Sequence, residues 1–274
     1  RFLLQLFRQL LVNINMQLFE YSIDLSPAIF IKRYKRFFVD VERKSGLQEA
    51  VHCANSGSMK SCYENGSICY TLDSHNKERK LRHSLELIEL KDGLVCVNTA
   101  RANQCVKSFL NQLFLENTKY SHIIPSDFKA VIGSYDTFRA EAKYSSDTRF
   151  DFCLEKNDSD KKCWIEVKSI SLKLDEKTLS FPDAVTERGR KHLLKLIEAK
   201  KSGNDAWLFF CIMRSSRLDI QTIENNFRIA SEIDPAYFQT FNLAVQSGVR
   251  VALLIMDITL QNISLRKFSL KPFG

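Results

Sequence analysis

The spacing of apolar residues divides the chain into two parts with different periods. Between residues 22 and 97, apolar runs of strand length cover residues 28–41, 48–53, 67–72 and 84–90. Turn residues separate these runs, at Ser45-Gly46, residues 55–58, Asn65-Gly66 and Asp92-Gly93. Several short strands at regular spacing predict a small β-barrel over this part of the chain.

After residue 97 the pattern changes to helices alternating with strands. Apolar positions at helical spacing predict a helix over residues 101–117, and a second helix over residues 184–201 with Asp183 as its N-cap. Strands are expected at residues 137–144, 149–154 and 163–170. The all-apolar run at residues 206–213 is typical of a strand buried on both faces. A helix at residues 235–247 and a strand at residues 249–257 complete the set.

The resulting order, α-β-β-β-α-β-α-β, predicts a mixed sheet covered by helices on both faces, an α/β (α+β) domain. We therefore divide the chain into an N-terminal extension (1–21), a barrel (22–95), a helix-covered sheet domain (96–258) and a C-terminal tail (259–274). The sequence does not specify an oligomeric state, and a homodimer is one option.

The first twelve residues form an apolar run that Arg8 and two glutamines interrupt. We interpret this run as an upstream extension, with an amphipathic helix at a membrane surface as the alternative. It is too short to span a bilayer, and no other segment approaches that length. We expect a cytoplasmic protein without a membrane partner.

The charge of the chain favours an anionic partner. Its 40 Lys and Arg residues exceed its 32 Asp and Glu residues, which gives a formal net charge of +8 and a pI near 9.0. Nucleic acid is the commonest partner for such a surplus, and a generic basic surface is the alternative.

The eight cysteines contain no Cys-x-x-Cys pair and are scattered through apolar runs. This pattern favours burial as free thiols in a reducing cytoplasm. Zinc binding by His52, Cys53, Cys62 and Cys69 is the alternative.

The residues with the strongest chemical pattern are Asp151, Glu166 and Lys168. Glu166 and Lys168 are two apart on one predicted strand, so their side chains project to the same face. A hairpin from the preceding strand can bring Asp151 beside Glu166. Two carboxylates next to an ammonium group are suited to Mg²⁺ (or Mn²⁺) and a phosphodiester. The alternative is an ordinary cross-strand ion pair on a solvated face.

Seven strings carry a resemblance to a known family. They read RYKRF at 33–37, HCANSGSM at 52–59, VNTARANQ at 97–104, KY at 143–144, RFDF at 149–152, IEVKS at 165–169 and FPDAVTERGRKHL at 181–193. In this order the chain resembles the bacterial sugar fermentation stimulation protein A family. The Asp…Glu-x-Lys arrangement also resembles the PD-(D/E)XK nuclease superfamily.

The resemblance implies an OB-like barrel followed by a restriction-nuclease-like domain, DNA binding, and a regulatory role in sugar (maltose) metabolism. It assigns metal binding to Asp151 and Glu166, and the position of the catalytic lysine to Lys168. One position departs from the family pattern, because Ser108 stands where the first nuclease helix tends to carry Glu. That departure puts cleavage in doubt.

Several basic residues in these strings are candidate DNA contacts: Arg33, Lys35, Arg36, Arg101, Lys143, Arg149, Arg188, Lys191 and His192. In the barrel the cations are interleaved with Phe37 and Phe38. Basic residues neutralise phosphates and aromatic rings stack on unpaired bases, although alternation favours at least one of these two rings in the barrel core.

Three functions follow, in order of preference. The first is a DNA-binding protein that contacts mainly the phosphate backbone. The second is an active Mg²⁺- or Mn²⁺-dependent DNA nuclease. The third is a protein-interaction regulator without a nucleic-acid partner.

Overall fold

The computed structural model describes residues 16–115, 124–215 and 217–271. The segment 1–12, for which we expected an extension or an interfacial helix, lies outside these residues. Within the described part of the chain, no helix is long and apolar enough to cross a membrane.

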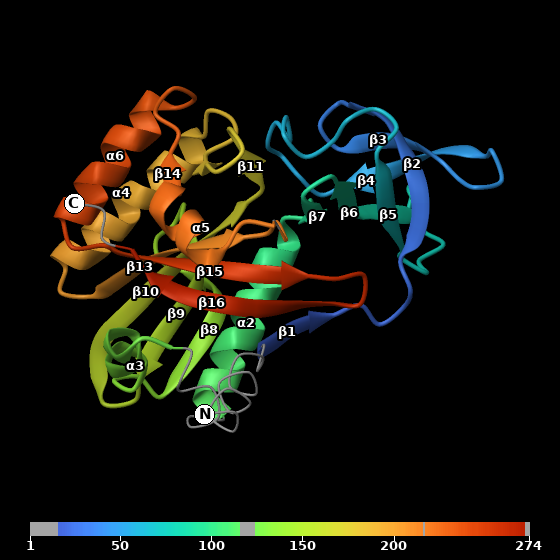
Figure 1. Cartoon of the computed structure of the whole chain (residues 1–274). Coiled ribbons are helices and arrows are strands. Elements are labelled where there is room, and N and C mark those ends of the chain that lie inside the picture. The colour runs from blue at the N-terminus through green and yellow to red at the C-terminus, as the bar shows by residue number, and fades with distance from the viewer. Residues whose placement is uncertain (1–15, 116–123, 216, 272–274) are drawn as a thin grey trace, which may run out of the picture.

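The N-terminal part of the chain folds as a closed five-stranded barrel, as the sequence predicts (Figure 1). Its strands are β2 (Ser26–Tyr34), β3 (Phe38–Glu42), β4 (Gln48–Cys53), β5 (Ile68–Asp73) and β6 (His83–Leu90). Antiparallel pairs join β4 to β3, β3 to β2, β2 to β5 and β5 to β6, and a short parallel pairing of β4 with β6 closes the ring. β7 (Gly93–Cys96) extends the sheet from β6 toward the second domain.

The predicted run at residues 28–41 is two strands, β2 and β3, joined by a turn at residues 35–37. Alternation continues through both strands, which conceals the turn in the sequence. Phe30, Val39 and Val41 point inward and are fully buried. In these two strands the barrel core therefore takes every second residue.

The second domain is built on a seven-stranded mixed sheet of order β1-β16-β15-β13-β10-β9-β8. Its strands are β1 (Met16–Glu20), β8 (Thr137–Lys143), β9 (Arg149–Lys156), β10 (Ser159–Ile170), β13 (Asp205–Ile212), β15 (Arg250–Ile258) and β16 (Asn262–Leu270). The central strands β10, β13 and β15 are parallel, and the outer pairs are antiparallel. A small sheet of β11 (Leu172–Lys173), β12 (Leu179–Phe181) and β14 (Arg228–Ile229) lies beside it.

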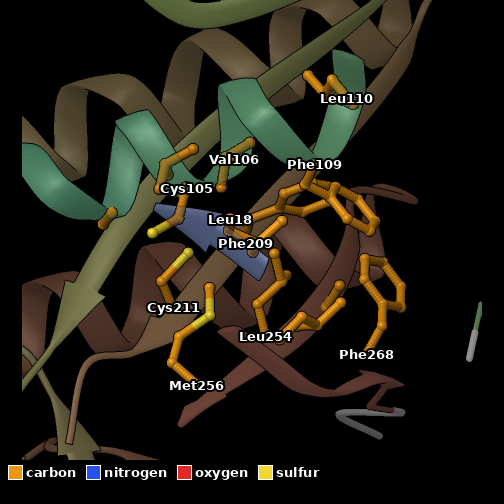
Figure 2. Close-up of a cluster of buried hydrophobic side chains, with 14 of the residues drawn as sticks. Leu18, Cys105, Val106, Phe109, Leu110, Phe209, Cys211, Leu254, Met256 and Phe268 are labelled. Atoms are coloured by element: carbon orange, nitrogen blue, oxygen red, sulfur yellow. The ribbon is translucent and has the colours of Figure 1, made fainter. Parts of the chain in front are cut away.

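Helices cover both faces of the large sheet, as the order of elements predicts (Figure 1). α2 (Ala100–Leu115) and α3 (Ser126–Ile132) pack on one face, and α4 (Glu187–Lys201) and α6 (Pro235–Gln246) on the other; α5 (Ile220–Asn226) precedes β14. Figure 2 shows the first face, where Phe109 of α2 meets Phe209 of β13 and Phe268 of β16. Because both faces are covered, β13 is apolar along nearly its whole length.

The two segments assigned to an extension and a tail contribute the last two strands at one end of this sheet. β1 pairs with β16, and β16 pairs with β15. Met16, Ile263 and Phe268 are fully buried in the core beneath α2. The sheet therefore continues beyond residue 258, and residues 16–20 belong to it although the barrel follows them in sequence.

Asp183 does not cap α4, contrary to the prediction; Thr186 is the N-cap, and its hydroxyl accepts from the Gly189 N–H. The Asp183 carboxylate instead accepts from the Met59 N–H at 3.0 Å, in the barrel. Gly57 makes this contact possible, because a Cβ atom there would lie 2.3 Å from both Asp183 carboxylate oxygens. Local capping rules cannot reveal a partner that is 124 residues away in sequence.

A buried arginine joins the domains at a second point. Arg214, which is 4% exposed, pairs with Asp92 after β6 and donates to the carbonyls of Ser61 and Ser171. Lys173 contacts the same Asp92 carboxylate at 2.6 Å. The paired cations hold the pKa of Asp92 below its usual value, although burial acts to raise it. The barrel is thus fixed to the sheet domain by ionic contacts as well as by apolar packing.

We predict that Gly57→Ala destabilises the contact between the domains by about 1–3 kcal/mol, the usual cost of overpacking. Gly57 is not among the glycines with positive φ, so alanine adds a steric clash without backbone strain. Chemical denaturation should show the loss. Asp183→Ala removes the clashing atoms, so the double variant should be less destabilised than the sum of the single variants; strictly additive costs would contradict the docking.

Candidate metal and phosphate site

Glu166 lies near the middle of the large sheet, on the strand between β9 and β13. Its neighbours Ile165 and Val167 fill the core under α2, so alternation turns Glu166 toward α4 on the opposite face. The residue is only 3% exposed. A carboxylate buried to this degree needs charged partners to remain ionised.

Two side-chain nitrogen atoms meet one oxygen of Glu166. Lys168 Nζ and His192 Nδ1 each lie 2.5 Å from Oε1. The sequence prediction that Glu166 and Lys168 share a face is confirmed, and His192 of α4 supplies a contact that spacing does not reveal. The other oxygen, Oε2, is buried without a hydrogen-bond partner among the described residues.

These contacts determine the protonation of Glu166. Burial acts to raise its pKa, but Lys168 and His192 together outweigh burial and lower the pKa below its usual value. The ionised carboxylate can only accept hydrogen bonds, so the Nδ1 atom of His192 must be the donor. In the neutral imidazole this leaves the lone pair on Nε2.

Asp151 approaches from the neighbouring strand β9. The β9–β10 ladder pairs Phe152 with Ile165, so the next positions along it are Asp151 and Glu166. Asp151 Oδ2 accepts from the Val167 N–H at 2.7 Å, and Oδ1 accepts from Asn103 Nδ2 at 2.6 Å. Burial, followed by the nearby charge of Glu166, raises the pKa of Asp151 to about 6.

This arrangement fits a hard divalent cation. Mg²⁺ is usually held by one or two carboxylates, with waters and substrate phosphates completing its shell. Among the described residues Oε2 of Glu166 has no partner, which makes it a ready ligand atom. A cation beside both carboxylates would relieve the repulsion from Glu166 that, after burial, raises the pKa of Asp151. No group of three or more His, Cys, Asp or Glu side chains suited to a metal occurs in the described ranges, so oxygen ligands from water or substrate would be required.

Two of the predicted DNA contacts, Arg33 and Arg101, make extensive contacts within the protein. Arg33 donates to four backbone carbonyls, those of Arg36, Asn55, Gly57 and Ser58. Its guanidinium group holds the 55–58 loop in place.

Arg101 makes a bidentate contact with Glu86 and lies over the rings of Phe19 and Tyr21. Its side chain is only 11% exposed. Charge alone did not distinguish these two partly buried arginines from surface cations.

The other predicted cations are exposed. Lys35 and Arg36 lie at the tip of the β2–β3 hairpin. Lys143 and Arg149 face each other across the β8–β9 ladder. Arg188 lies one turn before His192 on the same face of α4.

Lys191 pairs with Asp147 at 2.7 Å, while its own side chain is 46% exposed. Its phosphate contact stays a prediction.

Ser108 does not face the candidate site. Its hydroxyl accepts from Gln112 Nε2, and the same Gln112 nitrogen donates to the Gln17 carbonyl of β1. At about 100° per residue, Ser108 lies far around α2 from Asn103, the residue that contacts Asp151. A carboxylate at position 108 would therefore point toward β1, away from Asn103.

All eight cysteines are free and buried, as the sequence predicts. Cys53 contacts Met59 Sδ, and Cys62 donates to the Ser171 carbonyl. The alternative of a zinc site at His52 and the nearby cysteines finds no support among the described residues.

The class of this protein is defined by an OB-like barrel joined to a helix-covered mixed sheet, which carries two carboxylates and a lysine on the adjacent strands β9 and β10. Two family models match it: the SfsA N-terminal OB domain over residues 31–97 and the sugar fermentation stimulation protein RE domain over residues 101–262. The chain belongs to the sugar fermentation stimulation protein family, which confirms the resemblance seen in its sequence.

Individual relatives agree with this assignment. The chain is 40% identical to a sugar fermentation stimulation protein homolog from Bdellovibrio bacteriovorus, over 88% of this chain and 94% of that one. It is 38% identical to the Pelagibacter ubique homolog, over 84% and 89%. The structure of Pyrococcus furiosus SfsA in complex with Ca²⁺ matches with a TM-score of 0.70 at 22% identity, covering 92% of this chain and 97% of that one. This last match shows a shared fold.

We predict that Asp151 gives the metal-free protein a measurable pH dependence. Its pKa is raised from 3.8 to about 6, so between these values the folded protein holds a proton that the unfolded chain releases. Stability should therefore fall as pH rises from about 4 to 6, by up to about 3 kcal/mol, and then level off. Denaturation in EDTA at several pH values, compared with Asp151→Asn, should show this extra slope only in the wild type; parallel curves would contradict it.

Proposed function

We propose that the protein binds DNA through its phosphate backbone, and that a divalent cation held by Asp151 and Glu166 joins one phosphate to the protein. The observation that carries this proposal is the state of Glu166. Its Oε1 atom is held by Lys168 and His192, while its buried Oε2 atom has no partner among the described residues. A carboxylate held by one oxygen is oriented to offer the other to a ligand.

The cation itself is supported by the chemistry of the donors. Mg²⁺ and Mn²⁺ prefer carboxylate, water and phosphate oxygens, and such an ion would neutralise a phosphodiester and lower the pKa of a bound water. The Pyrococcus furiosus relative was solved with Ca²⁺, another hard cation that takes oxygen ligands. Asp151 and Glu166 are the residues that we expect to hold the ion.

Exposed cations support the phosphate contacts. Lys143 and Arg149 lie directly opposite each other on adjacent strands, an arrangement of like charges that is unfavourable unless an anion lies between or beside them. Arg188 extends the same positive character from the exposed face of α4, one turn from His192. Contacts of this kind position a duplex without reading its bases.

The second candidate function is metal-dependent hydrolysis of the phosphodiester, which the pair Lys168 and His192 favours. The ammonium group of Lys168 can stabilise charge that develops on a phosphate oxygen. The Nε2 atom of His192 is free to accept a proton from the attacking water, because Nδ1 is committed to Glu166. The regulatory role in sugar metabolism stays a prediction that depends on DNA binding. The cytoplasmic location stays a separate prediction.

Removing the free oxygen of Glu166 should test the first function. In Glu166→Gln we expect Mg²⁺ or Mn²⁺ affinity, measured by calorimetry, to fall at least about tenfold. The increase in affinity for duplex DNA that the metal causes in the wild type should disappear in this variant. The remaining binding of duplex DNA should weaken steeply as the salt concentration rises. Glu155→Gln is the control, because Glu155 pairs with Arg139 on the outer part of the sheet. Equal metal binding by both variants would exclude Glu166 as a ligand.

The second function is tested by cleavage of single-stranded, duplex and branched DNA with Mg²⁺ or Mn²⁺. We expect Lys168→Ala and His192→Ala to lower the rate by about 10²- to 10⁴-fold. Lys162→Ala is the control, since Lys162 lies on the same strand and pairs with Glu155. The absence of turnover by the wild type on every substrate would leave binding as the function of the site.

A further inference from the structure

The turn between β2 and β3 exposes an aromatic ring beside two cations. Phe37 is 44% exposed, whereas large apolar side chains are mostly buried in folded proteins. Lys35 and Arg36 precede it and are also exposed. The ring of Phe37 lies almost parallel to that of His52 on β4, with 16° between the planes and 6.5 Å between the centroids.

The backbone of this turn is strained, because two residues other than glycine have positive φ angles. Lys35 has φ 47 and Arg36 has φ 63, values that glycine or asparagine adopts more readily. The Phe37 N–H donates to the Lys35 carbonyl at 2.7 Å, which closes a tight turn centred on Arg36. A three-residue turn with this hydrogen bond and a positive φ is rare and unfavourable. Strain of this kind is commonly kept where side chains have a function.

Cationic side chains lie near the Phe37 and His52 rings, while the His52 ring itself is uncharged. Burial, and then the charge of Arg79, lower the pKa of His52. A neutral imidazole stacked beside Phe37 extends the flat apolar surface. Lys35, Arg36 and Arg79 surround it with cations, so the surface complements flat, uncharged rings that are joined by anionic groups.

The hairpin between β3 and β4 lacks this combination. Leu47, at the turn after β3, is 62% exposed but is aliphatic. The Phe37 turn is also linked to the candidate metal site, since Arg33 ties the carbonyl of Arg36 to the 55–58 loop, which contacts Asp183 before α4. The barrel turn and the start of α4 are therefore held in a fixed relation.

From this geometry we propose that Phe37 and His52 form a stacking platform for the unpaired bases of single-stranded DNA, with Lys35 and Arg36 on the flanking phosphates. Bases stack on aromatic side chains regardless of sequence, and cations that follow the backbone complete such sites. The inference rests on the proposed DNA binding and specifies a single-stranded segment as the ligand of the barrel.

The test is fluorescence anisotropy with a labelled oligo(dT) of about 15 nucleotides, alongside a duplex of the same length. We expect Phe37→Ala to weaken oligo(dT) binding by about tenfold or more, Phe37→Trp to retain it, and Leu47→Ala to leave it unchanged. Duplex affinity should change little in all three variants.

Arg36→Gly separates binding from folding. Glycine relieves the positive φ of residue 36, so its melting temperature should be unchanged or higher while oligo(dT) affinity falls. Oligo(dT) affinity that is unchanged in both Phe37→Ala and Arg36→Gly would overturn the platform, even if the duplex still bound at the metal site. A wild type that binds neither DNA at low salt would instead overturn the proposed function, and this inference with it.

Discussion

The candidate site depends on the buried charge of Glu166. A carboxylate at the centre of a sheet, 3% exposed, is costly unless cations compensate it. Lys168 from the same strand and His192 from α4 provide this compensation at a single oxygen. The position of α4 is consequently determined by charge as well as by the apolar core beneath it. Removing either side chain would leave the carboxylate under-compensated, so stability and ligand binding are coupled through the same atoms.

The site and the barrel share a second constraint, the segment just before α4. Asp183 contacts the barrel at Met59 N–H, while Thr186 caps the helix that carries His192. Gly57 permits the approach, and Arg33 fixes the same loop to the Phe37 turn. Movement of the barrel would therefore displace the start of α4. This polar network fixes the two domains relative to each other, because each carbonyl and carboxylate in it accepts from a defined donor.

Much of the fold could be predicted from the sequence because the spacing of apolar residues reflects which side chains are buried. The period-2 runs gave the barrel strands, and the apolar run at residues 206–213 corresponds to β13 (Asp205–Ile212), buried on both faces. The pairing of Glu166 with Lys168 followed from strand alternation alone. Long-range partners were not accessible: nothing local indicates that β1 joins β16, or that Asn103 reaches Asp151. Those contacts depend on the folded topology.

The arginines show why charge predicts a partner class better than it predicts individual contacts. Arg33 and Arg101 are as basic in sequence as Arg36 and Arg188, yet one binds backbone carbonyls and the other binds Glu86. A planar guanidinium with five donors satisfies buried acceptors as effectively as it binds phosphate. Only burial separates the two uses. The exposed cations lie at the β2–β3 tip, at the β8–β9 pair and on α4, so positive charge is available on both domains that flank the Asp183 junction.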